Sequence, residues 1–196
     1  MKPIFEKNSA LSISVFLLAL YLFSSFEEYV IHKYVMHKKI DLPYLKETYD
    51  DHIKHHIDTN KDFTVKNNDH LNICFSFMTI VPLFFVTVFL LYIVFNTIIS
   101  LNIIIISVVI FLIIHMVVWN TLHSYVHYFD VNTICKNAVY GVPKEYINEK
   151  NIYVKWSLDN HRAHHYFKDD KKGNWNVVFP GADYILGSHN TIPTTM

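Results

Sequence analysis

The chain has 196 residues, 52% of them hydrophobic, and a formal net charge of zero at pH 7. This composition is too apolar for an ordinary soluble domain, and the zero net charge leaves no general electrostatic case for a nucleic-acid partner. The length predicts a single domain over residues 1–196. The two cysteines form no CxxC pair, so the sequence predicts neither a disulfide framework nor a thiolate metal site.

The first apolar stretch runs from Ala10 to Phe26, and its 17 residues reach the lower length limit of a membrane-spanning helix. A cleaved signal peptide is the alternative, because lysines precede the stretch, but no convincing small-residue cleavage site follows it. The sequence HKYVMH comes next and contains His32 and His37. On an α-helix this spacing separates two side chains by about 140°, so the pair could serve two metals or flank one site.

The polar segment 38–70 contains a second histidine group, DDHIKHH, with His52, His55 and His56. On a helix these three imidazoles lie within an arc of about 100°. Neutral imidazole is a common ligand of iron, zinc, copper and nickel. The segment is therefore a candidate contributor to a metal site.

Two longer apolar stretches follow, Ile73–Phe95 and Ile98–Trp119, with only Asn96 and Thr97 between them. Each is long enough to cross a bilayer as a helix, and the short connection predicts a transmembrane hairpin. Pro82 lies inside the first of the two, where a membrane helix tolerates it with a kink. Together with the N-terminal stretch, the sequence predicts three spans.

The last two histidine groups follow the third span. The sequence HSYVH places His123 and His127 about 40° apart on a helix, and DNHRAHH in the polar tail repeats the spacing of the second group with His161, His164 and His165. Three spans in this order bring all four groups to one membrane face. Seven lysines in segment 32–70 and eight basic residues in segment 128–196, with none at the hairpin tip, predict that this face is cytosolic.

Ten of the 13 histidines thus fall into four short boxes: His32 and His37; His52, His55 and His56; His123 and His127; His161, His164 and His165. A single HxxxH pair is more often packing or chance than a site, but four boxes at one face are difficult to explain by chance. Ten ligands suit two metals with about five imidazoles each, which leaves a position open for oxygen or water. His70, His115 and His189 lack box spacing, and His115, within a span, is a candidate group supporting the ligands.

Three acidic residues stand next to the boxes and could orient a ligating imidazole. Glu28 lies one helical turn before His32, Asp51 directly precedes His52, and Asp159 precedes His161 with Asn160 between them. The tryptophans are interpreted as membrane-interface anchors rather than as part of the chemistry: Trp119, Trp156 and Trp175.

The ordered set HxxxxH, HxxHH, HxxxH and HxxHH, interleaved with apolar helices, resembles the fatty acid hydroxylase superfamily, which includes sterol desaturases and acyl 2-hydroxylases. EYVIHKYVMH is similar to its first box with the preceding Glu-Tyr, and HRAHHYFKDDKKGNWNVVFPGADYILGS is similar to its last box with the closing segment. The resemblance covers about residues 15–188. The chain departs from the pattern in lacking a proline soon after the second box, in the 34 residues from His127 to His161, and in having three apolar stretches where members commonly have four spans.

The resemblance implies an all-α integral membrane bundle of three or four spans with a histidine-rich helical cap on the cytosolic face. It implies a membrane-bound di-iron enzyme that hydroxylates or desaturates a lipid C–H bond with O₂, the ten box histidines being the ligands of two metal ions. Iron is expected, and zinc can substitute on overexpression. Because no HPGG haem-binding module is present, a separate protein would donate the electrons, and the location would be the endoplasmic reticulum in a eukaryote.

Two alternatives remain at the level of the sequence. A carotenoid hydroxylase shares a first box like HKYVMH but often has a wider third box than HSYVH. A non-catalytic membrane protein that binds or transports metal would also carry histidines, but a transporter would place them near the middle of its spans. Among the histidines, only His115 lies well inside an apolar stretch.

Overall fold

The computed structural model describes residues 6–66, 74–75, 77–128, 141–168 and 171–193. Within them the fold is helical, apart from one isolated β-bridge between Thr59 and Val65. The elements in chain order are α1 Ala10–Val30, the π-helix η1 Ile31–Met36, α2 Pro43–Asp58, α3 Phe77–Phe95, α4 Leu101–Val126, the 3₁₀ turn η3 Lys144–Tyr146, α6 Ile152–Tyr166 and the short α7 Ala182–Ile185. The helical fold class is confirmed.

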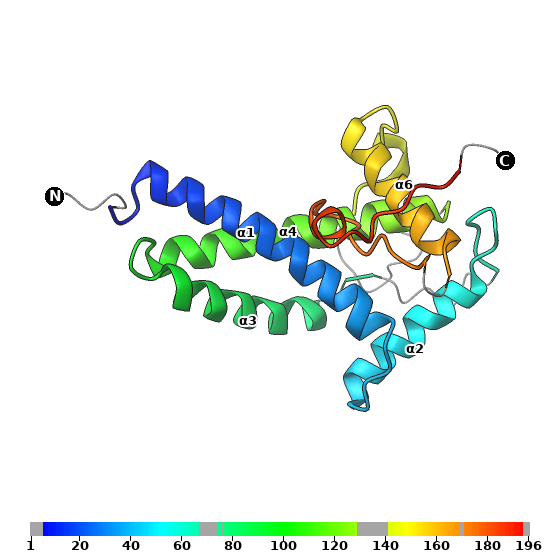
Figure 1. Ribbon diagram of the computed structural model, residues 1–196, viewed down its shortest axis with the longest axis horizontal. Helices are drawn as coiled ribbons and strands as arrows, with labels where there is room; N and C mark the ends of the chain where they lie inside the picture. The colour runs from blue at the N-terminus through cyan, green and yellow to red at the C-terminus, as the bar shows by residue number, and fades with distance from the viewer. Residues whose placement is uncertain (1–5, 67–73, 76, 129–140, 169–170, 194–196) are drawn as a thin grey trace.

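Helices α1, α3 and α4 run side by side as an elongated bundle, while α2 and α6 lie at one end of it (Figure 1). Helix α1 begins at Ala10 and is capped by Ser9, whose side chain accepts a hydrogen bond from the backbone N–H of Ser12. The helix continues without a break into η1. It is therefore longer than the apolar stretch from which it was predicted. As a result, the first histidine box lies on the same continuous helical segment as the apolar stretch.

Among the described residues, two helical segments are long and apolar enough to cross a membrane, Ala10–Met36 and Leu101–Val126. The helix between them, α3, has a shorter apolar part, Thr79–Phe95, which contains Pro82. The hairpin of α3 and α4 predicted around Asn96 is present, with Ser100 as the N-cap residue of α4. A third span in the membrane stays a prediction.

The three bundle helices share an apolar core. Phe16 and Leu20 of α1 are fully buried against Ile104 and Val108 of α4, and the ring of Phe16 meets that of Phe95 edge-on at 5.4 Å. The outward faces of α3 and α4 are also apolar, since large hydrophobic side chains are exposed along both helices: Val86, Phe89, Ile93, Ile106, Ile110 and Ile113. Such continuous apolar exposure is typical of a surface that meets lipid or another protein.

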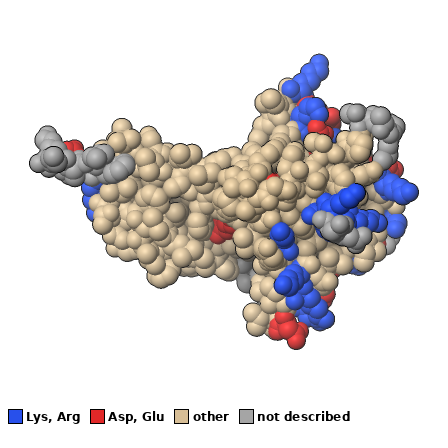
Figure 2. Space-filling view, viewed as in Figure 1, with Lys and Arg blue, Asp and Glu red and all other residues tan. Residues whose placement is uncertain are grey.

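Charged side chains gather at the end of the molecule that carries α2 and α6, while the visible face of the bundle is almost free of them (Figure 2). Four helical segments bring their histidine boxes to this charged end: η1, α2, the C-terminal part of α4, and α6. Cys74, just before α3, is disulfide-bonded, which the cysteine spacing did not predict. The other cysteine of the chain, Cys135, lies outside the described residues.

Candidate metal centre

All ten box histidines lie at one end of the bundle, as their order along the chain predicts. Their imidazoles form two groups in which the candidate ligand atoms lie within 4.8 Å of one another. We call these the box-one cluster, which consists of His32, His37, His52 and His164, and the box-three cluster, which consists of His55, His123, His127, His161 and His165. The tenth histidine, His56, has its Nε2 atom 3.2 Å from that of His52 and 3.1 Å from that of His164, so it adjoins the box-one cluster.

The Nε2 atoms within a cluster point at one another at distances that hydrogen bonding alone does not explain. The Nε2 atom of His52 lies 3.2 Å from that of His32, 2.9 Å from that of His37 and 3.2 Å from that of His56. An imidazole nitrogen has a single lone pair or a single proton, so one nitrogen cannot make three such bonds.

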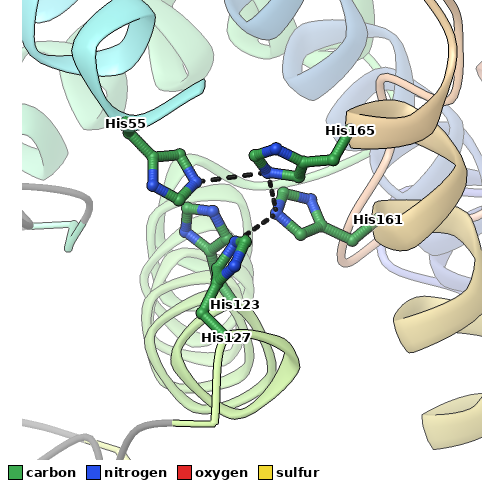
Figure 3. Close-up of side chains that lie close together, drawn as sticks. All are labelled: His55, His123, His127, His161 and His165. Atoms are coloured by element: carbon green, nitrogen blue, oxygen red, sulfur yellow. Dashed lines mark hydrogen bonds between the residues drawn. The ribbon is translucent and has the colours of Figure 1, made fainter. Parts of the chain in front are cut away.

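These distances are the ones expected between nitrogens that could share one metal ion. Two nitrogens bound at about 2.1 Å to one ion lie about 3.0 Å apart at a right angle and about 3.4 Å apart at the tetrahedral angle. The box-three cluster shows the same spacing, with Nε2 contacts of 3.2 Å between His55 and His165, 3.1 Å between His165 and His161, and 3.3 Å between His127 and His161 (Figure 3). These buried histidine clusters could hold metal ions.

The two clusters are neighbours because the adjacent histidines of the HxxHH boxes divide between them. On α2, His55 belongs to the box-three cluster while His56 adjoins the box-one cluster, and on α6 His165 and His164 divide in the same way. The rings of His56 and His165 stack across the boundary with their centroids 4.2 Å apart. The two clusters could therefore hold two ions side by side.

A π-helix explains why His32 and His37 join one cluster despite the wide HxxxxH spacing. In a π-helix the backbone hydrogen bonds join residue i to residue i+5, so residues five apart lie above one another as residues four apart do in an α-helix. The element η1 spans Ile31–Met36, and His37 is its C-cap residue. Of the two arrangements that the sequence left open, the structure therefore shows the one with both imidazoles at a single site.

Backbone carbonyls hold three of the imidazoles with the Nε2 atom turned inward. The Nδ1–H groups donate to the carbonyl of Trp175 from His32 at 2.7 Å, to that of Gly173 from His164 at 2.8 Å, and to that of Phe63 from His127 at 2.8 Å. A donor bond at Nδ1 leaves the lone pair on Nε2, which is the tautomer that a metal-binding histidine needs.

The segment that supplies two of these carbonyls, residues 173–179, is clamped between α1 and α6. Glu28 of α1 accepts hydrogen bonds from the backbone N–H groups of Val177 and Val178 at Oε1, each 2.9 Å, and of Phe179 at Oε2, 3.0 Å. From α6, the hydroxyl of Ser157 donates to the carbonyl of Val177 at 2.6 Å. The segment thus fixes box one and box four relative to each other.

The prediction that Glu28 contacts the imidazole of His32 is wrong. The carboxylate is saturated by amides of the closing segment, and it acts on His32 only through the segment that carries the Trp175 carbonyl. His115, the candidate supporting group, lies beside this carboxylate rather than beside a box histidine: its Nε2 atom is 3.7 Å from Oε1 of Glu28. Asp159 is half-exposed and pairs with Lys155 and Arg162 on the surface of α6. The role predicted for Asp51 stays a prediction.

Two of the three tryptophans are not interface anchors. Trp119 is 2% exposed and Trp175 is 4% exposed, and each forms a wall of the metal centre. The ring of Trp119 lies 5.6 Å from that of His32 and 5.0 Å from that of His123. The ring of Trp175 lies 5.0 Å from that of His37. Trp156 is half-buried on α6 and donates from its indole nitrogen to the hydroxyl of Tyr184.

Sequence reasoning missed the residues that shape the closing segment. Asp183 accepts from the backbone N–H groups of Trp175 at 3.0 Å and Asn176 at 2.7 Å, and Ser188 donates to it at 2.7 Å. Gly173 has no room for a side chain, because a Cβ atom there would lie 2.0 Å from the carbonyl oxygen of Ser188. These residues are visible in the sequence, in the GNWN stretch and in the Asp and Gly-Ser that follow it. Their contacts with one another can be recognised only when the fold is known.

Burial keeps neutral those box histidines that lie outside the apolar spans. Removal from water lowers the pKa of His127 to about 4 and that of His37 to about 2, and the charges of His32 and Lys172 add to the lowering of the pKa at His37. The same cause lowers the pKa well below the usual value at the others: His52, His55, His56, His161, His164 and His165. Neutral imidazole is the form that binds metal.

The remaining histidines stay apart from the clusters. His189 contacts Asn160 and Asn174 behind the fourth box, with its Nδ1 atom 3.0 Å from Oδ1 of Asn160. His70 lies outside the described residues. Comparison of the chain with protein-family models, with curated proteins and with solved structures finds no match. The case for a function therefore depends on the geometry of the site.

Proposed function

We propose that the chain is a membrane-bound oxidoreductase with two iron ions that hydroxylates or desaturates a C–H bond of a lipid. One observation carries the proposal: the ten box histidines form two adjacent, buried, all-imidazole clusters at the end of long apolar helices. A structural zinc site is normally closed by four ligands, whereas these clusters offer about five imidazoles each. Two neighbouring sites at a membrane boundary suit a reaction between a lipid and a small oxidant.

In this proposal the box-one cluster with His56 would hold one ion and the box-three cluster the other. Iron bound there would supply the activation of O₂ that an unactivated C–H bond requires. The protein's own contribution is positioning and exclusion of water. The carbonyls of Gly173, Trp175 and Phe63 orient three imidazoles, and the buried rings of Trp119 and Trp175 separate the ligands from water.

The proposal includes the membrane arrangement that the sequence predicts. Three spans would leave the histidine-bearing end at the cytosolic face, where a separate electron-donor protein could reach it. The half-buried histidines support access from that side, because His37, His56 and His165 are the box residues that remain partly exposed. The disulfide at Cys74 favours the opposite orientation, since disulfides rarely persist in the cytosol. Lysine placement carries the greater weight in the proposal.

A carotenoid hydroxylase would use the same clusters on another lipid, and a metal transporter would need its ligands nearer mid-span. Lipid profiling of cells that express the chain distinguishes these alternatives. Cells with the wild-type chain should contain an oxidised or desaturated lipid that is absent from cells with His55→Ala or His56→Ala, although both variants insert into the membrane.

The matched control for this experiment is His70→Ala, outside every box, which should retain most of the product. A wild-type profile identical to that of the two box variants would contradict the proposed function. Equal loss from His70→Ala and His56→Ala would mean that the segment acts through folding, and the metal role of box two would have to be dropped.

A further inference from the structure

Residues 173–188, which we call the C-terminal loop, enter the helix bundle and come back out of it. The loop begins beside the candidate metal centre, where the carbonyl of Gly173 accepts a hydrogen bond from His164. It ends at the same place, because the carbonyl of Ser188 accepts from the N–H of Asn174 at 3.1 Å. Between these ends the chain runs alongside the bundle, and the returning helix α7 packs against α1 (Figure 1).

The tip of the C-terminal loop reaches the middle of two long apolar helices. The ring of Phe179 stacks on that of Phe111 of α4 at 5.7 Å and meets that of Tyr21 of α1 edge-on at 5.9 Å. The hydroxyl of Tyr21 donates to the carbonyl of Pro180 at 2.6 Å. Within the candidate membrane span Ala10–Met36, Tyr21 lies about 16 Å from the start and about 22 Å from the end, at 1.5 Å per residue. The tip therefore lies near mid-span rather than at the charged end.

The polar backbone groups at the tip are paired with side chains of the neighbouring helices. The hydroxyl of Ser25 on α1 donates to the carbonyl of Phe179 and accepts from the N–H of Ala182, each at 2.8 Å. Tyr153 of α6 donates to the carbonyl of Val178 at 2.6 Å. A bilayer core has no water to satisfy such groups, so non-helical backbone is tolerated at that depth only where protein pairs and buries it. The tip meets this requirement.

The outward surface of the C-terminal loop is apolar. On α7, the side chains of Tyr184, Ile185 and Leu186 are each at least 50% exposed. The loop contains one charged residue, Asp183, which is 1% exposed and accepts hydrogen bonds from backbone N–H groups. This apolar surface continues the exposed apolar surface of the bundle helices beside it, which indicates that lipid rather than water covers both.

We propose that the C-terminal loop is a re-entrant membrane segment whose residues Ile185 and Leu186 contact the acyl chains of the bilayer. The proposal depends on the membrane location in the proposed function, but not on the metal or on catalysis. Hydropathy does not reveal the segment, because its apolar run is short and is interrupted by Asp183. The same loop supplies the carbonyls that orient His32 and His164, so the bilayer helps to hold these imidazoles in place.

Site-directed spin labelling tests the proposal on the full chain in phosphatidylcholine vesicles. A nitroxide is attached to a cysteine introduced in turn by Ile185→Cys, by Leu18→Cys on α1 and by Ile57→Cys near the end of α2. The native side chains are 62%, 61% and 66% exposed, so the protein itself shields none of the three positions. The wild-type chain, labelled in the same way, gives the background from its native cysteines.

The measurement compares collisions of each label with O₂, which concentrates in lipid, and with chromium oxalate, which stays in water. The ratio of O₂ to chromium oxalate collisions should be several-fold higher at Ile185 and Leu18 than at Ile57. A label at Ile185 that behaves like the one at Ile57 would overturn the proposal. Protection of the Ile185 label from both reagents would also overturn it, because protein rather than lipid would then cover α7.

The position on α1 separates this proposal from the proposed function. A label at Leu18 in lipid with a label at Ile185 in water would overturn the re-entrant segment and leave the membrane span standing. Water exposure at both positions would overturn the membrane location in the proposed function, and the re-entrant segment with it.

The hydrogen bonds of Ser25 provide a second test, with a matched control on the same helix. Ser25→Ala leaves a carbonyl and an N–H group at the tip without partners, so the Ile185 label should gain chromium oxalate collisions several-fold as the loop moves toward water. Ser12→Ala removes a buried hydroxyl whose partner is the carbonyl of Glu6, far from the loop, and should leave the collisions unchanged. Equal collision rates in the two variants would overturn the anchoring of the loop by α1.

Discussion

At the scale of single residues, the candidate metal centre depends on hydrogen bonds that lie one step away from the histidines. The imidazole rings of His32 and His164 donate to the carbonyls of Trp175 and Gly173. These carbonyls belong to a segment whose backbone N–H groups are held further along by the carboxylates of Glu28 and Asp183. Two negative charges are thus used to hold backbone amides rather than to bind metal. Substitution of either carboxylate should displace the imidazoles while all ten box histidines remain in the chain.

Glu28 provides the sharpest test at this scale. Glu28→Ala leaves three buried N–H groups, those of Val177, Val178 and Phe179, without acceptors. Each unsatisfied group costs about 1–3 kcal/mol, so the free energy of unfolding should fall by about 3 kcal/mol or more. Thermal unfolding in detergent measures the loss.

The neighbouring carboxylate supplies the control. Glu27 accepts a single side-chain hydrogen bond, from the hydroxyl of Thr87 at 2.9 Å, so Glu27→Ala should destabilise the protein much less. If both alanine variants unfolded at the same temperature, the clamp on residues 177–179 would not be the role of Glu28.

Box spacing singled out the ten histidines that the structure brings together, but it did not identify the groups that hold them in place. Box spacing is a local pattern, so His52, His55 and His56 can be recognised without the fold. The partner of His32 lies 143 residues away, and it is a backbone carbonyl, which every residue has. No residue type marks such an acceptor, and the nearby Glu28 was therefore the natural but incorrect choice.

At the scale of elements, the π-helix η1 is the least expected feature. Apolar stretches predicted α1, α3 and α4 because a helix of that length must be apolar to pack or to meet lipid. Hydropathy contains no signal for a change from i+4 to i+5 hydrogen bonding. The HxxxxH spacing itself was the signal, since it brings two imidazoles together only if the helix widens.

This interpretation of η1 predicts opposite effects of deletion and insertion. Deletion of Tyr34, which is 44% exposed, converts HxxxxH to HxxxH, and an ordinary α-helix then keeps both imidazoles on one face. Insertion of one alanine after Tyr34 gives HxxxxxH, which places the two imidazoles about 120° apart around an α-helix, compared with about 40° for HxxxH.

The metal content of the two purified variants measures the difference. The deletion should retain the metal of the box-one cluster, and the insertion should lose it while the box-three cluster, on other elements, keeps its own. Equal loss of metal from both variants would show that the exact length of η1 matters and that its helix type does not.

At the scale of the whole molecule, the site is assembled from elements distant in the chain, and its imidazoles are buried as neutral groups. A histidine whose folded pKa lies below its unfolded value of about 6.5 stabilises the protein above that pH and destabilises it as the pH falls, because the unfolded state takes up more protons. Folded pKa values of about 4 for His127 and about 2 for His37 place this loss below about pH 6.5.

The metal-free protein should therefore unfold at progressively lower temperature as the pH falls from about 7 to about 5. The measurement is thermal unfolding of chelator-treated protein in detergent across this range. A flat profile would mean that the histidines are accessible to protons in the folded state and that the clusters are open rather than buried.

Orientation in the membrane is a further property of the whole molecule. Lysine placement predicts a cytosolic location for the polar segment 38–70 and for the tail after Tyr128, whereas the disulfide at Cys74 favours an oxidising compartment. A glycosylation acceptor introduced into the tail at residues 190–193 should remain unmodified in eukaryotic cells. Modification of that acceptor would reverse the proposed orientation.

The central claim is that the ten box histidines hold two metal ions, and counting those ions tests it most directly. The chain is expressed in iron-supplemented medium, purified gently without chelators, and analysed for iron and zinc against protein concentration. The account predicts about two ions per chain in total, with zinc able to replace iron in an all-imidazole site. A wild-type protein that is folded and carries no metal, or a single ion, would contradict it.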